Sequence, residues 1–112
     1  MKSPASLPKG AAFDLAYAKG SVKAGPFFVV RTLPNVSGEA RWGFAVGKKQ
    51  WRKATDRNRV RMRLRVVARR ISGAPGADIV ITARARADRA SLDELSVALR
   101  QQLGLSGDEP RR

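Results

Sequence analysis

The sequence contains no cysteine and no histidine among its 112 residues. The lack of cysteine excludes a disulfide framework and any thiolate metal site, and the lack of histidine excludes imidazole acid–base chemistry and histidine-bound metals. Acids are also scarce, since 9 Asp and Glu stand against 23 Lys and Arg, which gives a formal net charge of +14. Because such an excess destabilises a compact chain by self-repulsion, it favours a polyanionic partner.

Long hydrophobic runs are missing as well. No apolar run is long enough to cross a bilayer, and the first residues lack the hydrophobic stretch of a secretion signal. We therefore expect a cytoplasmic protein that does not enter a membrane. The length favours one domain over residues 1–112, with flexible ends at 1–9 and 105–112.

The hydrophobic patterning predicts helix, strand, strand, helix, strand and helix, in that order. Strands are expected over 27–33, 41–46 and 78–83. Helices are expected over 11–19, from Thr55 or Asp56 to about Ile71, and from the Ser91–Glu94 capping box to about Leu103. The first two strands flank a connection that resembles a hairpin. We therefore expect an α+β fold, with a small single sheet packed against helices.

The segment 48–65 is unusually dense in positive charge. Aliphatic residues recur in and after it at helical spacing: Val60, Leu64, Val67 and Ile71. They predict one buried stripe on a helix. No acid occurs between Arg57 and Arg70, whereas a solvated helix normally mixes charges of both signs. The remaining surface of this helix is therefore predicted to bind a polyanion.

A nuclease site built by the protein itself is not expected. Two-metal hydrolysis requires clustered carboxylates, but the acids are spread singly along the folded part of the sequence except for Asp93–Glu94. We therefore assign no catalytic residue and no metal ligand to the protein. A hidden cluster of acids in space, which would make a protein-only nuclease, stays open as an alternative.

Arg57-Asn58-Arg59, preceded by Gly43-Phe44-Ala45-Val46 and followed by further basic residues, resembles the protein subunit of bacterial ribonuclease P. The resemblance extends over residues 10–103, through Phe13-x-x-x-Tyr17-x-x-Gly20, residues 27–35 and residues 78–84. The sequence departs from the family pattern at Arg31, Gly47, Trp51, Met62 and Val66. The resemblance implies a fold like the second domain of ribosomal protein S5, with an uncommon left-handed βαβ crossover.

The resemblance also implies a function. Ribonuclease P is an endoribonuclease that removes the 5′ leader of precursor tRNA, and its catalysis resides in an RNA subunit. The implied partners are this catalytic RNA and precursor tRNA, and the protein is expected to be monomeric apart from RNA. Mg²⁺ ions are implied for the chemistry, held mainly by the RNA subunit. A different RNA-binding module, such as a ribosomal protein, is the alternative.

On this interpretation, the basic helix and the residues before it bind the catalytic RNA. The residues assigned to this role are Lys48, Lys49, Lys53, Arg57, Asn58, Arg59, Arg61, Arg63 and Arg65. The single-stranded leader is expected to stack on aromatic side chains, with an arginine adding charge. The residues assigned to the leader are Phe13, Tyr17, Phe28 and Arg31. Trp42 and Phe44, at alternating positions of a strand, are expected in the core.

Overall fold

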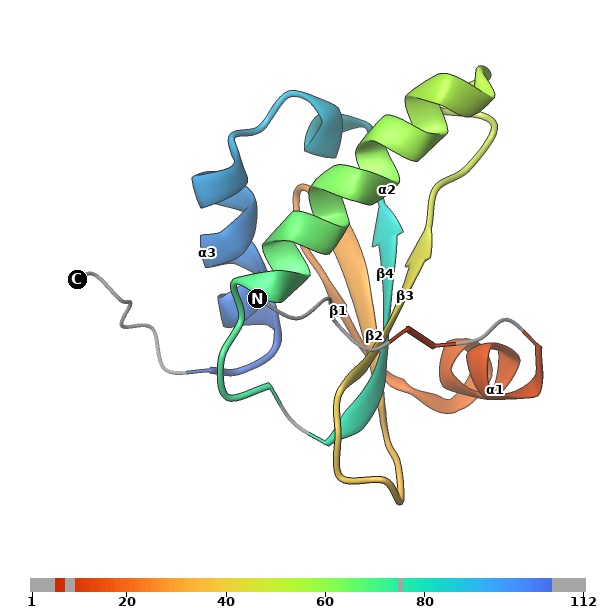
Figure 1. The fold of residues 1–112 in the computed structure, drawn as a ribbon, viewed down its shortest axis with the longest axis vertical. Helices are drawn as coiled ribbons and strands as arrows, with labels where there is room; N and C mark the ends of the chain where they lie inside the picture. The colour runs from red at the N-terminus through yellow and green to blue at the C-terminus, as the bar shows by residue number, and fades with distance from the viewer. Residues whose placement is uncertain (1–5, 8–9, 75, 106–112) are drawn as a thin grey trace.

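The computed structural model describes residues 6–7, 10–74 and 76–105 (Figure 1). Its elements are α1 (Ala11–Lys19), β1 (Ser21–Ala24), β2 (Phe28–Pro34), β3 (Arg41–Ala45), α2 (Ala54–Arg69), β4 (Ala77–Ala83), the 3₁₀ helix η1 (Ala85–Asp88) and α3 (Leu92–Gln102). The strands form one 4-stranded sheet in the order β1-β2-β4-β3. This arrangement confirms the predicted α+β fold with a single sheet.

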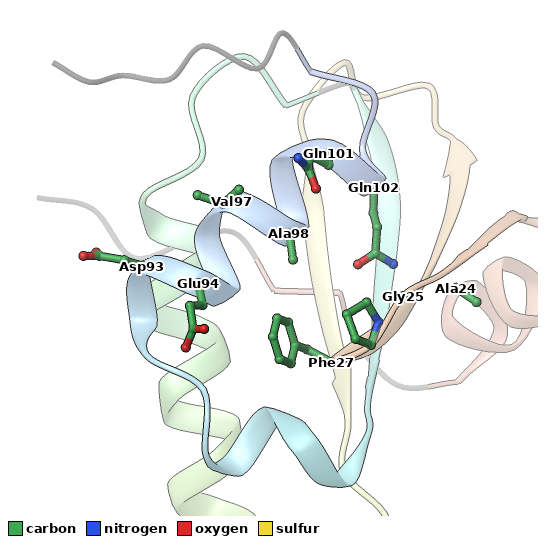
Figure 2. A pocket seen from close by; sticks show the side chains of 10 residues that line it. Ala24, Gly25, Phe27, Asp93, Glu94, Val97, Ala98, Gln101 and Gln102 are labelled. Carbon is green, nitrogen blue, oxygen red and sulfur yellow. The ribbon is translucent and has the colours of Figure 1, made fainter.

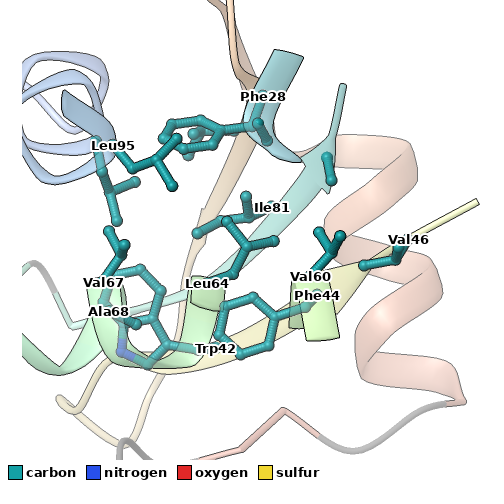
Figure 3. Packing of buried hydrophobic residues seen from close by; sticks show 14 of the residues in the cluster. Phe28, Trp42, Phe44, Val46, Val60, Leu64, Val67, Ala68, Ile81 and Leu95 are labelled. Atoms are coloured by element: carbon teal, nitrogen blue, oxygen red, sulfur yellow. The ribbon is translucent and has the colours of Figure 1, made fainter. Parts of the chain in front are cut away.

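One face of the sheet carries the larger part of the core. Side chains two residues apart on a strand share a face, and this face is covered by α2 and α3 (Figure 3). The fully buried side chains include Phe28, Ile81 and Leu95, and the predicted stripe of α2 is buried at Val60, Leu64 and Val67. Trp42 and Phe44 are buried in the same cluster, so their assignment to the core is confirmed.

The helix α1 packs on the opposite face of the sheet. Its Ala16 is fully buried and forms a small cluster with Leu7 and Val80. Phe13 lies against Gly43 of β3, where a Cβ atom would stand only 2.9 Å from the Phe13 ring. A residue with a side chain at position 43 would therefore force the Phe13 ring, or the helix that carries it, to shift, which explains glycine at this place in a strand.

The parallel pair β3 and β4 is joined by α2. In Figure 1 both strands point upwards, α2 lies in front of the sheet, and the chain moves leftwards from β3 to β4. The crossover is therefore left-handed, as the family resemblance implies and against the usual handedness of such connections.

The sheet differs from the sequence prediction in two respects. The prediction contained no strand at Ser21–Ala24, yet these residues form β1, which pairs antiparallel with β2. The prediction also treated β2 and β3 as a hairpin, which is wrong, because β4 lies between them and pairs with both. The connection over residues 35–40 therefore spans a central strand.

The ends of the helices are partly as predicted. The helix α1 has its predicted bounds, and the capping box of α3 is confirmed, since Ser91 Oγ accepts a hydrogen bond from the amide of Glu94 and Glu94 Oε1 accepts one from the amide of Ser91. The helix α2 begins earlier than predicted, with Lys53 as N-cap and no side-chain cap, so the capping role given to Thr55 or Asp56 is wrong. It also ends earlier, at Arg69.

The expected flexible ends lie mostly outside the described residues. Within the described part, Ser6 forms a bridge with Trp42, and the amide of Leu7 donates a hydrogen bond to the carbonyl of Trp42 at 2.8 Å. The chain at these two residues is therefore held against the edge of the sheet. No helix in the described ranges combines the length and the apolar character that crossing a bilayer requires.

Candidate nucleic-acid interface

Arg59 of α2 is held by two carboxylates. Its Nη1 lies 3.0 Å from Asp56 Oδ1, and its Nη2 lies 2.8 Å from Asp88 Oδ1 at the end of η1. The hydrogen bond from Arg59 lowers the pKa of the Asp88 carboxyl, against the opposing effect of its burial, and the nearby side chain of Trp51 acts in the same direction. Arg59 therefore joins the first turns of α2 to the segment that follows β4.

Arg63 and Arg70 continue this attachment along the same side of α2. Arg63 Nη2 donates a hydrogen bond to the carbonyl of Ala90, and Arg70 Nη1 lies 2.9 Å from Asp93 Oδ1 in α3. We call Arg59, Arg63 and Arg70 the tethered flank, because each of them binds a group in the 88–93 region. Part of the positive charge of α2 therefore serves the fold.

The turn before α2 is also organised by an arginine. Arg57 Nη1 donates hydrogen bonds to the carbonyls of Trp51 at 3.0 Å and Arg52 at 2.9 Å. Trp51 is buried in the main core cluster. These contacts fix the loop that presents exposed Lys48, Lys49 and Lys53.

The other side of α2 carries Arg61 and Arg65, which we call the open flank. Among the described residues, no acid forms an ion pair with either of them, and the Arg65 guanidinium carbon lies 5.7 Å from the centre of the Phe44 ring. Arg61 lines a hollow whose other walls come from α1 and from the end of β3, including Phe13, Tyr17 and Gly47. The open flank is thus a cationic wall beside an aromatic one.

The aromatic wall is extended by an arginine of β2. The rings of Phe13 and Tyr17 are nearly parallel, with their centres 6.4 Å apart. The guanidinium carbon of Arg31 lies 4.1 Å from the centre of the Tyr17 ring, and Arg31 Nη1 donates a hydrogen bond of 3.4 Å to Thr82 Oγ1. Since the Tyr17 residue is 46% exposed, this group offers flat surfaces and positive charge to a ligand.

The structure corrects one member of the predicted leader site. Phe28 is fully buried in the core on the face covered by α2 and α3, so it cannot contact a ligand in the hollow. Phe28 and Arg31 are three residues apart on one strand and therefore point to opposite faces. Phe13, Tyr17 and Arg31 do come together, on the face where α1 packs.

The residues predicted to bind the catalytic RNA fall into two groups, according to whether they already make contacts within the protein. Lys48, Lys49, Lys53 and Asn58 are exposed, and Arg61 and Arg65 are half-buried without an acidic partner in the described ranges. Arg57, Arg59 and Arg63 instead make hydrogen bonds within the protein. Sequence reasoning missed Asp88 and Trp51, which position the basic segment. Their only signal in the sequence was a lone acid and a lone tryptophan next to many arginines.

A second hollow lies between α3 and the turn that joins β1 to β2 (Figure 2). Its lining is mainly apolar and includes Phe27, Val97 and Ala98, together with the carboxylates of Asp93 and Glu94. A polyanion would be repelled by these two acids. The hollow beside α1 also has one acid in its lining, Asp14, but Arg61 lines it too, whereas no cation among the described residues lines the second hollow. The surface around α2 and α1 is therefore the better candidate for binding nucleic acid.

A cationic helix flank next to an exposed aromatic ring that stacks on a second, half-buried one is typical of a protein that binds RNA. The sequence profile of the family described as ribonuclease P matches residues 1–105. A ribonuclease P protein component from Dehalococcoides mccartyi (strain CBDB1) is 35% identical over 104 residues, which are 93% of this chain and 86% of that protein. The chain therefore belongs to the ribonuclease P family, and its function is that of the protein subunit of this tRNA-processing enzyme.

Solved structures agree with this assignment. The ribonuclease P protein from Thermotoga maritima superposes with a TM-score of 0.77 at 27% identity, covering 91% of this chain and 98% of that one. The protein from Staphylococcus aureus gives a TM-score of 0.74 at 29% identity, covering 88% and 92%. The similarity thus extends over nearly the whole fold, including the left-handed crossover that carries α2.

Proposed function

We propose that this protein binds the catalytic RNA of ribonuclease P through the basic surface of α2 and the loop before it. We further propose that the hollow between α1 and α2 binds the 5′ leader of precursor tRNA. In this proposal the RNA subunit performs the cleavage, and the protein positions the substrate. The observation that carries the proposal is the open flank, whose Arg61 lines one hollow with Phe13 and Tyr17 and whose Arg65 lies over the ring of Phe44.

The charge distribution supports binding of a large folded RNA by α2. The tethered flank already has partners in the protein, whereas the open flank and the loop lysines have no acidic partner in the described ranges. Arginine binds phosphate groups through two parallel hydrogen bonds and also stacks on bases. The net charge of +14 supports a protein that stays monomeric apart from RNA, because its copies repel one another.

The shape and chemistry of the hollow support binding of a single strand. Base stacking on aromatic side chains tolerates any sequence and contributes roughly 1–3 kcal/mol per base. A leader that differs from one precursor to the next requires such tolerance. Tyr17 with Arg31 above its ring offers both stacking and a charge for a neighbouring phosphate.

The placement of acids supports catalysis by the RNA. No group of three or more Asp, Glu, His or Cys side chains in the described ranges is arranged to hold a metal ion. The described carboxylates with shifted pKa values, Asp78 and Asp88, are both paired with arginines. We therefore propose that the Mg²⁺ ions of the reaction are held by phosphates of the RNA subunit. The cytoplasmic location remains a prediction from the sequence.

A cleavage assay at low Mg²⁺ concentration tests the first part of the proposal. The ribonuclease P RNA of Dehalococcoides mccartyi would be incubated with precursor tRNA, with and without this protein. We expect the protein to accelerate release of the leader. The double variant Arg61→Gln/Arg65→Gln should lose most of this acceleration and keep the unfolding temperature of the wild type.

A second variant of the same helix serves as the matched control. Arg59→Gln/Arg70→Gln removes the same number of charges from the tethered flank, and we expect it to lower the unfolding temperature while retaining more of the acceleration. If the two variants lose acceleration equally, the open flank has no special role. If the wild-type protein gives no acceleration and binds unrelated RNAs equally well, it is a general RNA-binding module instead.

Tyr17 provides the test of the leader site. Tyr17→Ala should weaken binding of precursor tRNA to the holoenzyme and leave binding of mature tRNA, which has no leader, unchanged. Tyr17→Phe keeps the aromatic ring and should behave as the wild type. Equal weakening for both tRNAs would contradict the assignment of the hollow to the leader.

A further inference from the structure

The segment between β4 and α3 carries exposed arginines that lie outside α2 and outside the hollow. In a 3₁₀ helix, side chains three residues apart lie on the same side. Ala87 is buried in η1, and Ala90, three residues later, is buried as well. Arg86 and Arg89 form a second row with this spacing, and both are exposed.

The backbone keeps this row in register. The amide of Arg89 donates a hydrogen bond of 3.2 Å to the carbonyl of Arg86, and the amide of Ala87 donates one of 2.9 Å to the carbonyl of Arg84. The two arginine side chains therefore start from neighbouring points of a fixed turn. The buried alanines below them hold the turn on the core.

The third side of the turn is attached to the basic helix. Asp88 accepts a hydrogen bond of 2.8 Å from Arg59 of α2. Arg63 adds a hydrogen bond to the carbonyl of Ala90. The row of Arg86 and Arg89 is therefore fixed beside the N-terminal half of α2, by contacts that neutralise Asp88 and leave the two arginines exposed.

The exposed row has no counter-charge inside the described part of the protein. No ion pair involves Arg86 or Arg89 there. Two like charges at this spacing destabilise a helical turn slightly. Asp88, the acid that lies between them in the sequence, is paired with Arg59. The arrangement resembles that of the open flank, where positive charge also lacks an acidic partner among the described residues.

We propose that Arg86 and Arg89 form a second phosphate-binding site, which contacts the sugar–phosphate backbone of the catalytic RNA beside α2. This inference rests on the proposed function, since it extends the surface that binds the RNA subunit. Arginine side chains on a rigid turn suit this role, because phosphate contacts fix position and orientation without reading sequence. The turn and the basic helix would then bind the RNA as one unit.

The salt dependence of RNA binding tests this proposal. The affinity of full-length protein for the ribonuclease P RNA of Dehalococcoides mccartyi would be measured over a range of salt concentrations, for the wild type and for Arg86→Gln/Arg89→Gln. Each lost phosphate contact reduces the slope of log affinity against log salt by about 1. We expect the double variant to bind more weakly, with a slope shallower by about 2, and to keep the unfolding temperature of the wild type.

Two comparisons make the result decisive. Lys19→Gln/Lys23→Gln removes the same net charge from exposed positions on α1 and β1, and it should leave the slope nearly unchanged. An equal loss of slope in both variants would overturn the proposal, because net charge alone would then explain it. A defect of Arg86→Gln/Arg89→Gln that appears only with precursor tRNA would also overturn it, since the RNA subunit would not be the ligand.

The open-flank variant separates this inference from the proposed function. If Arg61→Gln/Arg65→Gln weakens binding of the catalytic RNA and Arg86→Gln/Arg89→Gln does not, only the second site is wrong. If the wild type binds this RNA no better than an unrelated RNA of the same length, the proposed function fails, and the second site fails with it.

Discussion

Asp78 shows how a single acid can hold several parts of this fold. It is 5% exposed and accepts hydrogen bonds from Arg41 Nε at 2.8 Å, Arg41 Nη2 at 2.9 Å and Asn35 Nδ2 at 2.8 Å. Asn35 in turn orders the loop after β2 through a hydrogen bond to the carbonyl of Glu39. The carboxylate therefore ties the end of β2 and the start of β3 to the central strand β4.

The stability of the protein should depend on pH through Asp78. The hydrogen bond from Arg41 lowers the pKa of Asp78 in the folded state, while an unfolded Asp titrates near about 3.9. Its stabilisation is therefore present above that value and is lost as the pH falls through the lower folded pKa. We expect Asp78→Asn to be less stable than the wild type at pH 7, with a difference that shrinks at about pH 3 and below.

Urea unfolding at a series of pH values would measure this difference. Glu39→Gln, at an exposed position in the loop after β2, is the control and should follow the wild type. Asp88 also has a lowered pKa, but it is retained in both variants and cancels in the comparison. A stability gap between Asp78→Asn and wild type that is the same at pH 7 and pH 3 would contradict the assigned role.

Other single residues show where sequence reasoning succeeds and fails. The period of two in a strand was enough to place Trp42 and Phe44 in the core. The same rule separates Phe28 from Arg31, although the prediction had placed both in one site, Phe28 for its aromatic ring and Arg31 for its charge. The burial of Trp51 was not predictable, because the core cluster that it joins is built from several elements of the whole fold.

At the scale of elements, the helical period of α2 determines which of its residues are buried and which are exposed. Leu64 is 1% exposed, whereas Met62 on the same helix is 52% exposed. Leu64→Ala should therefore destabilise the protein by about 2–5 kcal/mol, since it removes buried methyl groups and leaves a cavity. Met62→Ala should change the stability by less than about 0.5 kcal/mol.

Chemical denaturation at neutral pH would check this pair of values. The two substitutions remove side chains of similar size from one helix, so helix propensity contributes little to their difference. Equal destabilisation by both variants would show that the stripe of Val60, Leu64 and Val67 does not anchor α2 as the structure indicates. The RNA affinity of Met62→Ala, compared with that of the wild type, would then show whether this exposed methionine contacts the ligand.

The elements that sequence reasoning missed lack a local signal. The strand β1 is exposed along its whole length, with Lys23 and Ala24 in place of a buried pattern, and it exists because β2 offers it a pairing partner. The start of α2 was misplaced because no side chain caps it, and Arg57 instead binds the carbonyls of the preceding loop. By contrast, α3 was placed correctly at its start, where the capping box is a local feature.

At the scale of the whole molecule, the order in which the strands pair could not be predicted from composition and periodicity. A short loop between two strands that are consecutive in the sequence predicts a hairpin. Here, however, β4, which comes later in the chain, lies between β2 and β3 in the sheet. The left-handed crossover likewise runs against the general rule, and only the family resemblance implied it. The positive surface of α2 was easier to predict, because its arginines lie close together in the sequence.

The net charge of +14 should make the stability of the protein depend on its ligand. A partner that binds only the folded state raises the unfolding temperature. We expect ribonuclease P RNA to raise it at about 0.1 M salt and to lose this effect at about 1 M, where the Debye length falls to roughly 3 Å. Fluorescence of the buried Trp42 and Trp51 reports the transition.

The protein without RNA must be measured at each salt concentration, because screening of self-repulsion alone also raises its stability. An unrelated RNA of equal length should produce a smaller increase at 0.1 M salt. An increase that persists undiminished at 1 M would show that the complex does not depend on phosphate contacts, and it would contradict the electrostatic basis of the interface.

The two edge strands of the sheet affect whether the protein aggregates before it binds RNA. At one edge of the sheet, β3 is paired at Trp42 by the bridge from Ser6. At the other edge, β1 has only four residues, all exposed, and includes Lys23. Short, charged or covered borders resist the strand-to-strand addition that leads to aggregation. Newly made copies should therefore remain dispersed at high concentration, so that assembly of the ribonucleoprotein does not have to compete with the growth of fibrils.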